Sequence, residues 1–166
     1  MKILLPVDGS DYTKRMLAYV AAHEEMFGAS HEYLALTAVG PVPPEVTQYV
    51  DRKTIEDYYR DQAESVLRPV REFAERNGWK LRDSRVVGAA GDAIATFART
   101  QAPDLIVMGS HGHSRIHRAL LGSVSEKVLA QSEIPVLLMR GNGCADPPVV
   151  PIEEPEQAEA ASGTPS

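Results

Sequence analysis

Cysteine and long apolar stretches are what this chain of 166 residues has least of. Cys144 is its single cysteine, so no disulfide can form within the chain. No apolar run approaches the ~20 residues that a membrane-spanning helix needs. The chain runs from Met1 directly into an apolar strand pattern, without the features of a signal peptide. These absences predict a cytoplasmic protein that does not enter a membrane.

Basic residues are also missing beyond Arg140, which changes the meaning of the net charge of −6. Residues 141–166 carry five acidic residues, which leaves 18 acids against 17 bases in residues 1–140. Rich in proline, alanine and glutamate and without apolar periodicity, residues 141–166 are predicted to form a disordered acidic tail. Residues 1–140 are predicted to form one domain. Because this domain is nearly neutral, nothing indicates a nucleic-acid partner.

Apolar segments alternate with helical periodicity throughout residues 1–140. Strands are expected at residues 2–7, 33–39, 81–87, 105–108 and 134–139, and helices at about 11–27, about 51–77, from about 92, and from 123. Parallel strands need crossover connections, and these are right-handed. The pattern therefore predicts an α/β fold with a doubly wound, five-stranded parallel sheet and helices on both faces. The weaker alternation of residues 81–87 is typical of a strand at a sheet edge.

The second expected helix is long and contains Pro69, which predicts a kink or a division into two helices. Its side chains at helical spacing predict the stripe that faces the sheet. This stripe consists of Ile55, Tyr59, Gln62, Val66, Val70 and Phe73.

The most informative segment is residues 104–139, which reads as strand, glycine-rich loop, helix, strand. Its loop has the pattern Gly109-x2-Gly112-x9-Gly122-Ser123. A helix that starts at the end of a parallel strand presents unpaired backbone N–H groups, which bind phosphate. Glycines let the backbone approach such a ligand closely. Positive character comes from five loop residues, namely His111, His113, Arg115, His117 and Arg118.

The same segment has a purely structural interpretation. The glycines would then mark turns, and Ser123 would only cap the helix, in a capping box with Glu126. Asp8 likewise allows two interpretations. It can cap the first helix, or its carboxylate, at the end of a central strand, can accept hydrogen bonds from a ribose.

These residues resemble the signature G-x2-G-x9-G-S/T of the universal stress protein family. Similar to the family as well are Pro6-Val7-Asp8-Gly9-Ser10, the run from Asp104 to Gly109, and Pro135-Val-Leu-Leu. The resemblance covers roughly residues 1–140. It implies an ATP-binding regulatory protein of the stress response, with Mg²⁺ bridging the phosphates and no catalytic residues. The implied nucleotide-binding residues are Pro6, Val7, Asp8, Ala38, Val39, Met108, Gly109, His111, Gly112, His113, Arg115, Gly122, Ser123, Val124 and Ser125.

The resemblance also implies the strand order 3-2-1-4-5. That order places the first and fourth strands side by side, with their connections leaving in opposite directions. Ligands bind in the crevice at such a switch point. Asp8 and Gly109, a hundred residues apart, are therefore expected at one pocket.

Two other functions stay open at this stage. An ATPase or nucleotidyl-transfer enzyme would need a base near the γ-phosphate, for which the loop histidines are candidates. However, the chain lacks the Walker A pattern G-x4-G-K-S/T. A homodimer formed through the apolar strand Ile134–Met139, which the family order places at a sheet edge, needs no ligand and is compatible with nucleotide binding.

Overall fold

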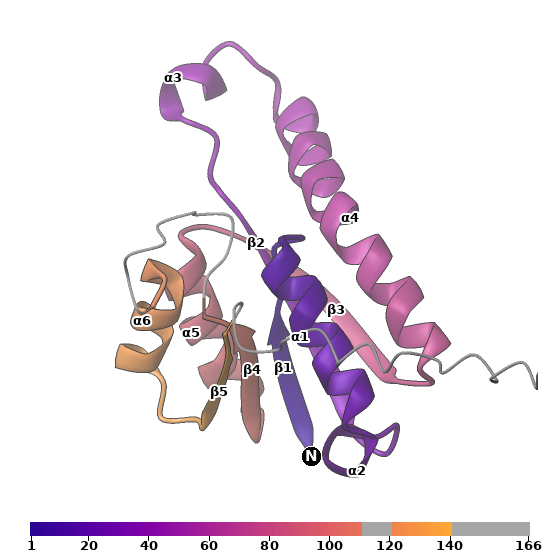
Figure 1. The fold of residues 1–166 in the computed structure, drawn as a ribbon. Helices are drawn as coiled ribbons and strands as arrows, with labels where there is room; N and C mark the ends of the chain where they lie inside the picture. Colours follow the sequence, from indigo (N-terminus) through magenta and orange to yellow (C-terminus); the bar gives the residue numbers. More distant parts are fainter. Residues whose placement is uncertain (111–120, 141–166) are drawn as a thin grey trace, which may run out of the picture.

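The computed structural model describes residues 1–110 and 121–140, which form a parallel five-stranded sheet between two layers of helices (Figure 1). The strand order is β3-β2-β1-β4-β5, and every pair is parallel. The strands are β1 (Lys2–Pro6), β2 (Glu32–Val39), β3 (Lys80–Val87), β4 (Leu105–Gly109) and β5 (Val136–Met139). This architecture confirms the predicted fold class and strand order. The predicted tail, residues 141–166, lies outside the described residues.

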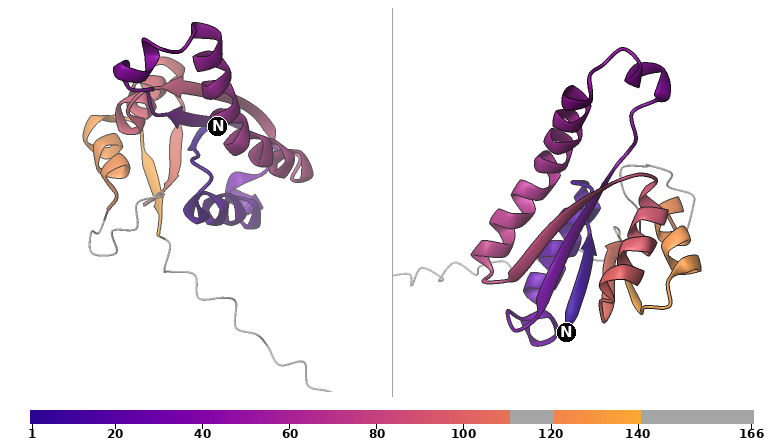
Figure 2. Two further views of the ribbon diagram at one scale, coloured as in Figure 1. Left: turned by 90° about the horizontal axis from the view of Figure 1, so that it is seen from above. Right: turned by 180° about the vertical axis from the view of Figure 1, so that it is seen from behind.

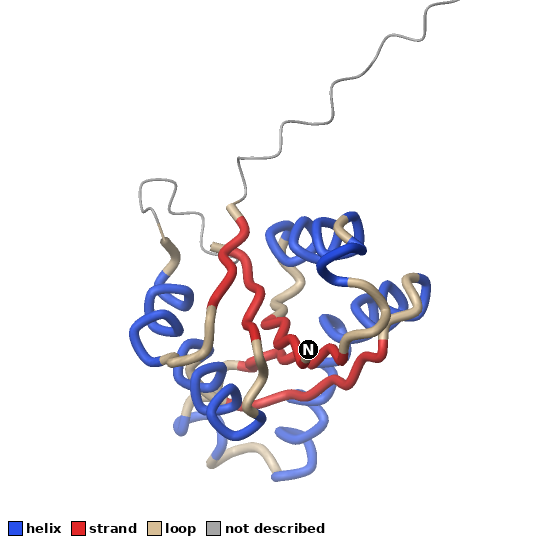
Figure 3. The backbone as a smooth tube through the Cα atoms, turned by 90° about the horizontal axis from the view of Figure 1, so that it is seen from below, coloured by secondary structure: helices blue, strands red, loops and turns tan. Residues whose placement is uncertain are grey.

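The helices lie in the connections between these parallel strands. They are α1 (Asp11–Ala22), α2 (Glu24–Phe27), α3 (Pro44–Thr47), α4 (Arg52–Arg76), α5 (Ala90–Gln101) and α6 (Ser123–Gln131). Figure 3, seen from the edge where β1 begins, shows helices on both sides of the strands. No helix among the described residues is long and apolar enough to span a membrane.

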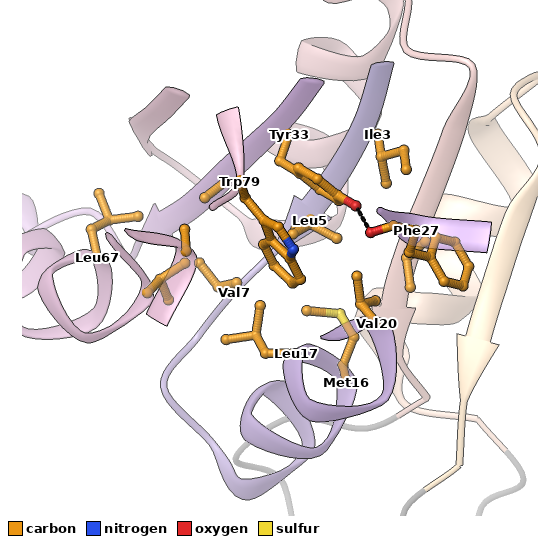
Figure 4. Packing of buried hydrophobic residues seen from close by; sticks show 14 of the residues in the cluster. Ile3, Leu5, Val7, Met16, Leu17, Val20, Phe27, Tyr33, Leu67 and Trp79 are labelled. Carbon is orange, nitrogen blue, oxygen red and sulfur yellow. Dashed lines mark hydrogen bonds between the residues drawn. The ribbon is translucent and has the colours of Figure 1, made fainter. Parts of the chain in front are cut away.

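The face covered by α1, α2 and α4 holds the larger core. Side chains of β1 and β2 pack there against Met16, Leu17 and Val20 of α1 and Leu67 of α4 (Figure 4). Tyr33 is fully buried and stacks on Trp79 with 4.4 Å between ring centroids. Its hydroxyl donates a hydrogen bond to the Phe27 carbonyl, and burial raises the pKa of this phenol to about 12.

The opposite face is covered by α5 and α6, which lie together in Figure 2. Alternate residues of the same strands point to this side, as expected for the two-residue period of a strand. The second core cluster contains Leu4, Leu34, Leu36, Ile94, Ala98, Ile106, Met108 and Val128. Because both faces are covered, the central strands are mostly apolar, which explains the continuous run from Ile3 to Val7.

Two predicted helices differ from the observed ones. The first was expected to continue to Phe27 but ends at Ala22, since His23 leaves helical geometry with φ −110° and ψ 58° before α2 starts. The second runs unbroken from Arg52 to Arg76 although it contains Pro69. Pro69 is exposed, so water can compensate for the hydrogen bond that its missing N–H removes.

Most of the predicted inward stripe of α4 is confirmed, because Val70 is buried and Tyr59, Val66 and Phe73 pack against the core. Gln62 is exposed, and the fully buried positions are Ala63, Leu67, Val70 and Ala74. Small alanines at two of these positions allow the helix to approach the sheet closely. The last strand is also shorter than predicted, because Ile134 and Pro135 precede β5 and only the Pro135 carbonyl joins the ladder, accepting from Ile106 N–H.

Candidate nucleotide-binding site

The turn after β1 is held together by its own side chains. The hydroxyl of Thr13 donates to Asp8 Oδ1 at 2.7 Å, and the Ser10 N–H donates to the same oxygen at 3.0 Å. Ser10 is the N-cap of α1, and its Oγ accepts the Thr13 N–H at 3.3 Å. Asp8 therefore sits just outside the helix instead of capping it directly, half-buried at the carboxyl end of β1.

Gly9 makes this turn possible. Its φ of +77° lies in the left-handed region, which side chains other than glycine rarely adopt. A Cβ at this position would also touch Val66 of α4 at 3.5 Å. The backbone of the turn is thus fixed between α1 and α4.

The turn after β4 is closed by backbone hydrogen bonds over a longer span. Ser110, only 1% exposed, donates its N–H to Met139 O at 2.8 Å and accepts the Gly122 N–H at 2.7 Å. The buried hydroxyl of Ser125 donates to the carbonyls of Gly109 at 3.0 Å and Ser110 at 3.2 Å. The two ends of the glycine-rich loop consequently meet at its base, and the start of α6 lies beside the end of β4.

The N-terminus of α6 corrects one prediction. The N-cap is Gly122, and Ser123 is the first helical residue. No side-chain hydrogen bond caps this helix, so the expected capping box of Ser123 and Glu126 does not form. The reason is the bond from Gly122 to Ser110, together with the Glu126 N–H donating to Gly122 O at 2.9 Å, which makes Gly122 the cap residue in place of Ser123. The side chain of Ser123 is exposed.

Helix α6 is held from its other side by α5. Lys127 Nζ contacts Asp92 Oδ2 at 2.6 Å, and the Gln131 side chain donates to Asp92 Oδ1 at 3.0 Å. The hydrogen bonds from Lys127 and then Gln131 hold the pKa of Asp92 below its usual value. The helices also approach closely at Gly91, where a Cβ would lie 2.8 Å from the Cβ of Lys127.

The end of β2 extends past the end of β1. Pro6, the last residue of β1, pairs with Leu36, while Ala38 and Val39 continue along β3. Val39 is buried and Ala38 half-buried. Pro6, Val7 and Met108 are buried as well, beneath the edge where Asp8 and Gly109 emerge.

Most predicted site residues therefore share the carboxyl edge of neighbouring strands. β1 and β4 are hydrogen-bonded neighbours, paired at Ile3 with Leu105 and at Leu4 with Ile106. The start of α6 adds Gly122, Ser123, Val124 and Ser125 to this edge. The remaining predicted residues, His111, Gly112, His113 and Arg115, lie outside the described residues.

Sequence analysis overlooked two residues at this edge. Thr13 and Ser110 are both buried polar residues whose hydrogen bonds fix the two turns. The spacing Ser10-x2-Thr13 was a usable signal, since a residue three positions after an N-cap faces back toward the cap. Ser110 had no local signal, because its partners lie 12 or more residues away.

Comparison with known proteins identifies the family of this chain. The family model described as "Universal stress protein family" matches residues 1–140. A universal stress protein of Thermus aquaticus is 34% identical over 139 residues, which cover 83% of this chain and 97% of the relative. The chain belongs to the universal stress protein family. The matched range is the same as the range of the sequence resemblance, residues 1–140.

Solved structures of family members share the fold. The structure of MJ0577 from Methanocaldococcus jannaschii superposes with a TM-score of 0.73 at 28% identity, covering 86% of this chain and 97% of that one. A universal stress protein in complex with cAMP has a TM-score of 0.62 at 24% identity, covering 84% and 96%. At that identity the second similarity establishes the fold.

Proposed function

We propose that this universal stress protein binds ATP at the carboxyl edge between β1 and β4 and acts as a nucleotide-dependent regulator in the stress response. The observation that carries the proposal is the closure of the loop base by Gly122 and Ser110. This closure places the start of α6 beside the strand that neighbours Asp8. An N-terminus that lacks a side-chain cap, at a switch point of a doubly wound sheet, suits a phosphate.

Each part of the nucleotide then has a proposed partner. The backbone at Gly109 and the N–H groups of Ser123–Ser125, with the exposed Ser123 hydroxyl, would hold the phosphates. The Gly122 N–H is already bonded to the Ser110 carbonyl, so Gly122 would contribute space for the phosphate. Asp8 would accept a hydrogen bond from the ribose. The backbone at Ala38 and Val39, which extends past β1, would contact the adenine. Pro6, Val7 and Met108 would form the apolar floor.

The loop between Ser110 and Leu121 would complete the phosphate site. His111, Gly112, His113 and Arg115 supply a glycine and positive side chains there. Charge-assisted hydrogen bonds from such groups to phosphate are roughly twice as strong as neutral ones. This part of the proposal rests on the sequence pattern.

Mg²⁺ is expected to arrive with the nucleotide. Within residues 1–110 and 121–140, no cluster of three or more His, Cys, Asp or Glu side chains could hold a metal ion. Mg²⁺ in nucleotide sites is usually bound by phosphate oxygens and water with one or two carboxylates. Asp8 suits such a partial role, either directly or through a metal-bound water.

Isothermal titration calorimetry of the purified protein with ATP, ADP, AMP and cAMP, each with and without Mg²⁺, tests the proposal. We expect ATP with Mg²⁺ to bind most tightly, because its phosphates reach the start of α6. Chromatography of any nucleotide released when the protein is denatured would identify the cellular ligand. The absence of binding by all four ligands would refute the proposed function.

Catalysis is the alternative function. The candidate bases His111, His113 and His117 lie outside the described residues, and among the described residues His23 and His31 lie near the opposite, amino edge of the sheet. We infer binding without turnover as the main activity. A multiple-turnover phosphate-release assay on the wild type and His111→Ala decides this point. Sustained release by the wild type that His111→Ala abolishes would identify an enzyme.

Homodimerisation through β5 is proposed alongside nucleotide binding. All four residues of β5 are apolar and half-buried, although β5 is an edge strand. An apolar edge pairs readily with a second strand, and a lysine in it opposes pairing. Val136→Lys is expected to give monomers in sedimentation equilibrium, whereas Val87→Lys on the opposite edge strand β3 is the matched control. A wild-type protein that is monomeric at micromolar concentration would exclude the dimer.

We place the protein in the cytoplasm.

A further inference from the structure

Thr13 is a buried hydroxyl-bearing residue that the proposed nucleotide contacts do not use. It is 5% exposed and lies in the first turn of α1. Its hydroxyl donates to Asp8 Oδ1 at 2.7 Å and accepts the Asp8 backbone N–H at 3.2 Å. A hydroxyl has one donor and two acceptor sites, so a single Thr13 can hold the main chain and the side chain of Asp8 together.

These bonds restrict the orientation of the Asp8 carboxylate. Oδ1 also accepts the Ser10 N–H at 3.0 Å. Two donors on one oxygen, from residues anchored in a helix, fix the plane of the carboxylate and therefore the direction of its second oxygen. Hydrogen bonds to a carboxylate are short and strong, so this arrangement is preorganised before any ligand arrives.

The Thr13 hydroxyl is not needed to cap α1. The cap bond joins Ser10 Oγ to the main-chain N–H of Thr13, which any residue would supply. The hydroxyl instead points back out of the helix to Asp8. The hydroxyl therefore serves mainly to hold Asp8 and contributes less to the stability of the helix.

We propose that Thr13 is a positioning residue that orients Asp8 to bind a ribose hydroxyl of the nucleotide. This inference rests on the proposed function, in which Asp8 contacts the ribose. Thr13 does not touch the ligand; it sets the angle at which the carboxylate meets the 2′- or 3′-hydroxyl. Without the Thr13 hydroxyl, Asp8 keeps its charge but loses its fixed direction, and discrimination between ribose and deoxyribose falls.

The test compares the affinities of the purified full-length protein for ATP, 2′-deoxyATP and 3′-deoxyATP by calorimetry. A lost hydrogen bond to a charged acceptor corresponds to about tenfold or more in affinity. We therefore expect the wild type to bind ATP at least about tenfold more tightly than the analogue that lacks the hydroxyl bound by Asp8. In Thr13→Val, which keeps the shape of the side chain, this ratio should fall to about two or less. Thr13→Ser retains a hydroxyl and should restore it.

Thr54→Val is the matched control. Thr54 donates to Asp51 Oδ2 at 2.7 Å, the same bond length, at the exposed start of α4. Its removal should leave the ATP-to-deoxyATP ratio unchanged. A general effect of losing a threonine–aspartate bond would appear in both variants, whereas positioning of the ribose contact appears only at Thr13.

The outcomes separate this inference from the proposed function. A wild type that binds none of the three nucleotides refutes the proposed function itself. A wild type that binds ATP, combined with a folded Thr13→Val that keeps the wild-type ratio, overturns the role of Thr13 alone. If Thr13→Val does not fold, Thr13→Ala carries the same expectation, with thermal unfolding measured on each variant.

Discussion

The two helices that begin at the edge of the central strands, α1 and α6, are positioned in different ways. The start of α1 is fixed locally, by hydrogen bonds among Asp8, Ser10 and Thr13. The start of α6 is fixed from a distance, by Ser125 reaching carbonyls 15 and 16 residues earlier and by Lys127 reaching Asp92, 35 residues earlier. One helix closes its own N-terminus with side chains, while the other relies on its neighbours.

This difference suggests that the two sides of the crevice bind different parts of the nucleotide. Because Ser10 caps α1, the Thr13 amide in the first turn of that helix is already engaged within the protein. Because Gly122 has no side chain, the cap position of α6 leaves the backbone to meet a phosphate. The α1 side is therefore suited to present one oriented carboxylate, and the α6 side to present N–H groups to an anion.

The largest effect is expected from Gly122→Val. Gly122 has φ −75° and ψ 152°, an extended conformation open to any residue, so the variant should fold. Its side chain would occupy the space through which a phosphate approaches the start of α6. Loss of two charge-assisted hydrogen bonds corresponds to an affinity at least about 100-fold weaker. Calorimetry with ATP measures this, and unchanged affinity in a folded variant would show that phosphate does not bind at α6.

A smaller effect, on stability, is expected from Gly91→Ala, which disturbs the packing of α5 against α6. The added Cβ would lie 2.8 Å from the Cβ of Lys127, too close for the helices to keep their spacing. We expect a net loss of about 1–2 kcal/mol in the free energy of unfolding, because the overpacking outweighs the higher helix propensity of alanine. Urea denaturation measures it. Gly40→Ala, where a Cβ meets nothing within 4 Å, is the control and should be near neutral.

The serine pair Ser10→Ala and Ser123→Ala tests the contrast directly. Ser10→Ala removes the cap of α1 and should cost about 1 kcal/mol of unfolding free energy. Ser123→Ala removes an exposed hydroxyl that makes no cap bond, so its stability should change by less than about 0.5 kcal/mol. Its ATP affinity should instead fall about tenfold, as expected for one lost hydrogen bond to a charged group. Equal loss of stability in both variants would remove the distinction between the helices.

The smallest effect concerns the acid sensitivity of the contact between α5 and α6. Because the pKa of Asp92 is lowered in the folded protein, its contact with Lys127 stabilises the fold above the unfolded pKa of about 3.9. This contribution is lost as the pH falls through the lower folded value. Asp92→Asn should therefore be less stable than the wild type near pH 6, with the difference shrinking as the pH falls below the unfolded pKa of Asp92. High salt should reduce the difference because the pair is exposed.

Features that depend on residues close together in the sequence could be predicted, whereas features that depend on contacts between distant residues could not. The strands could be predicted from apolar runs, and their order from the family resemblance. The turn after β1 is held by residues that lie within six positions of one another, so its signals are local. The start of α6 at residue 123 was predicted correctly, but its cap was assigned to Ser123 instead of Gly122, since the bond from Gly122 to Ser110 leaves no mark in the neighbouring residues. The break at His23 was missed for a related reason, because no glycine or proline marks it.

Packing details were the least predictable. The buried stripe of α4 uses Ala63 and Ala74, small residues that a search for large apolar side chains passes over. Pro69 was expected to kink or divide α4; the helix is not divided, and at this exposed position water can bond the carbonyl that Pro69 leaves without an N–H partner. At the site, β1, which Asp8 follows, and β4, which ends at Gly109, are neighbours, as the predicted strand order requires. The role of Thr13 required the geometry of its hydroxyl, which composition does not contain.

Titration of isotope-labelled protein with MgATP, followed by the NMR shifts of backbone amides, tests the central claim most directly. Ligand binding at the carboxyl edge predicts the largest shifts at Asp8, Gly109 and Gly122–Ser125. Amides at the opposite edge of the sheet, such as those of His31 and Asp104, should remain within the measurement error. Saturable binding whose shifts cluster at that opposite edge, or along β3, would contradict the account.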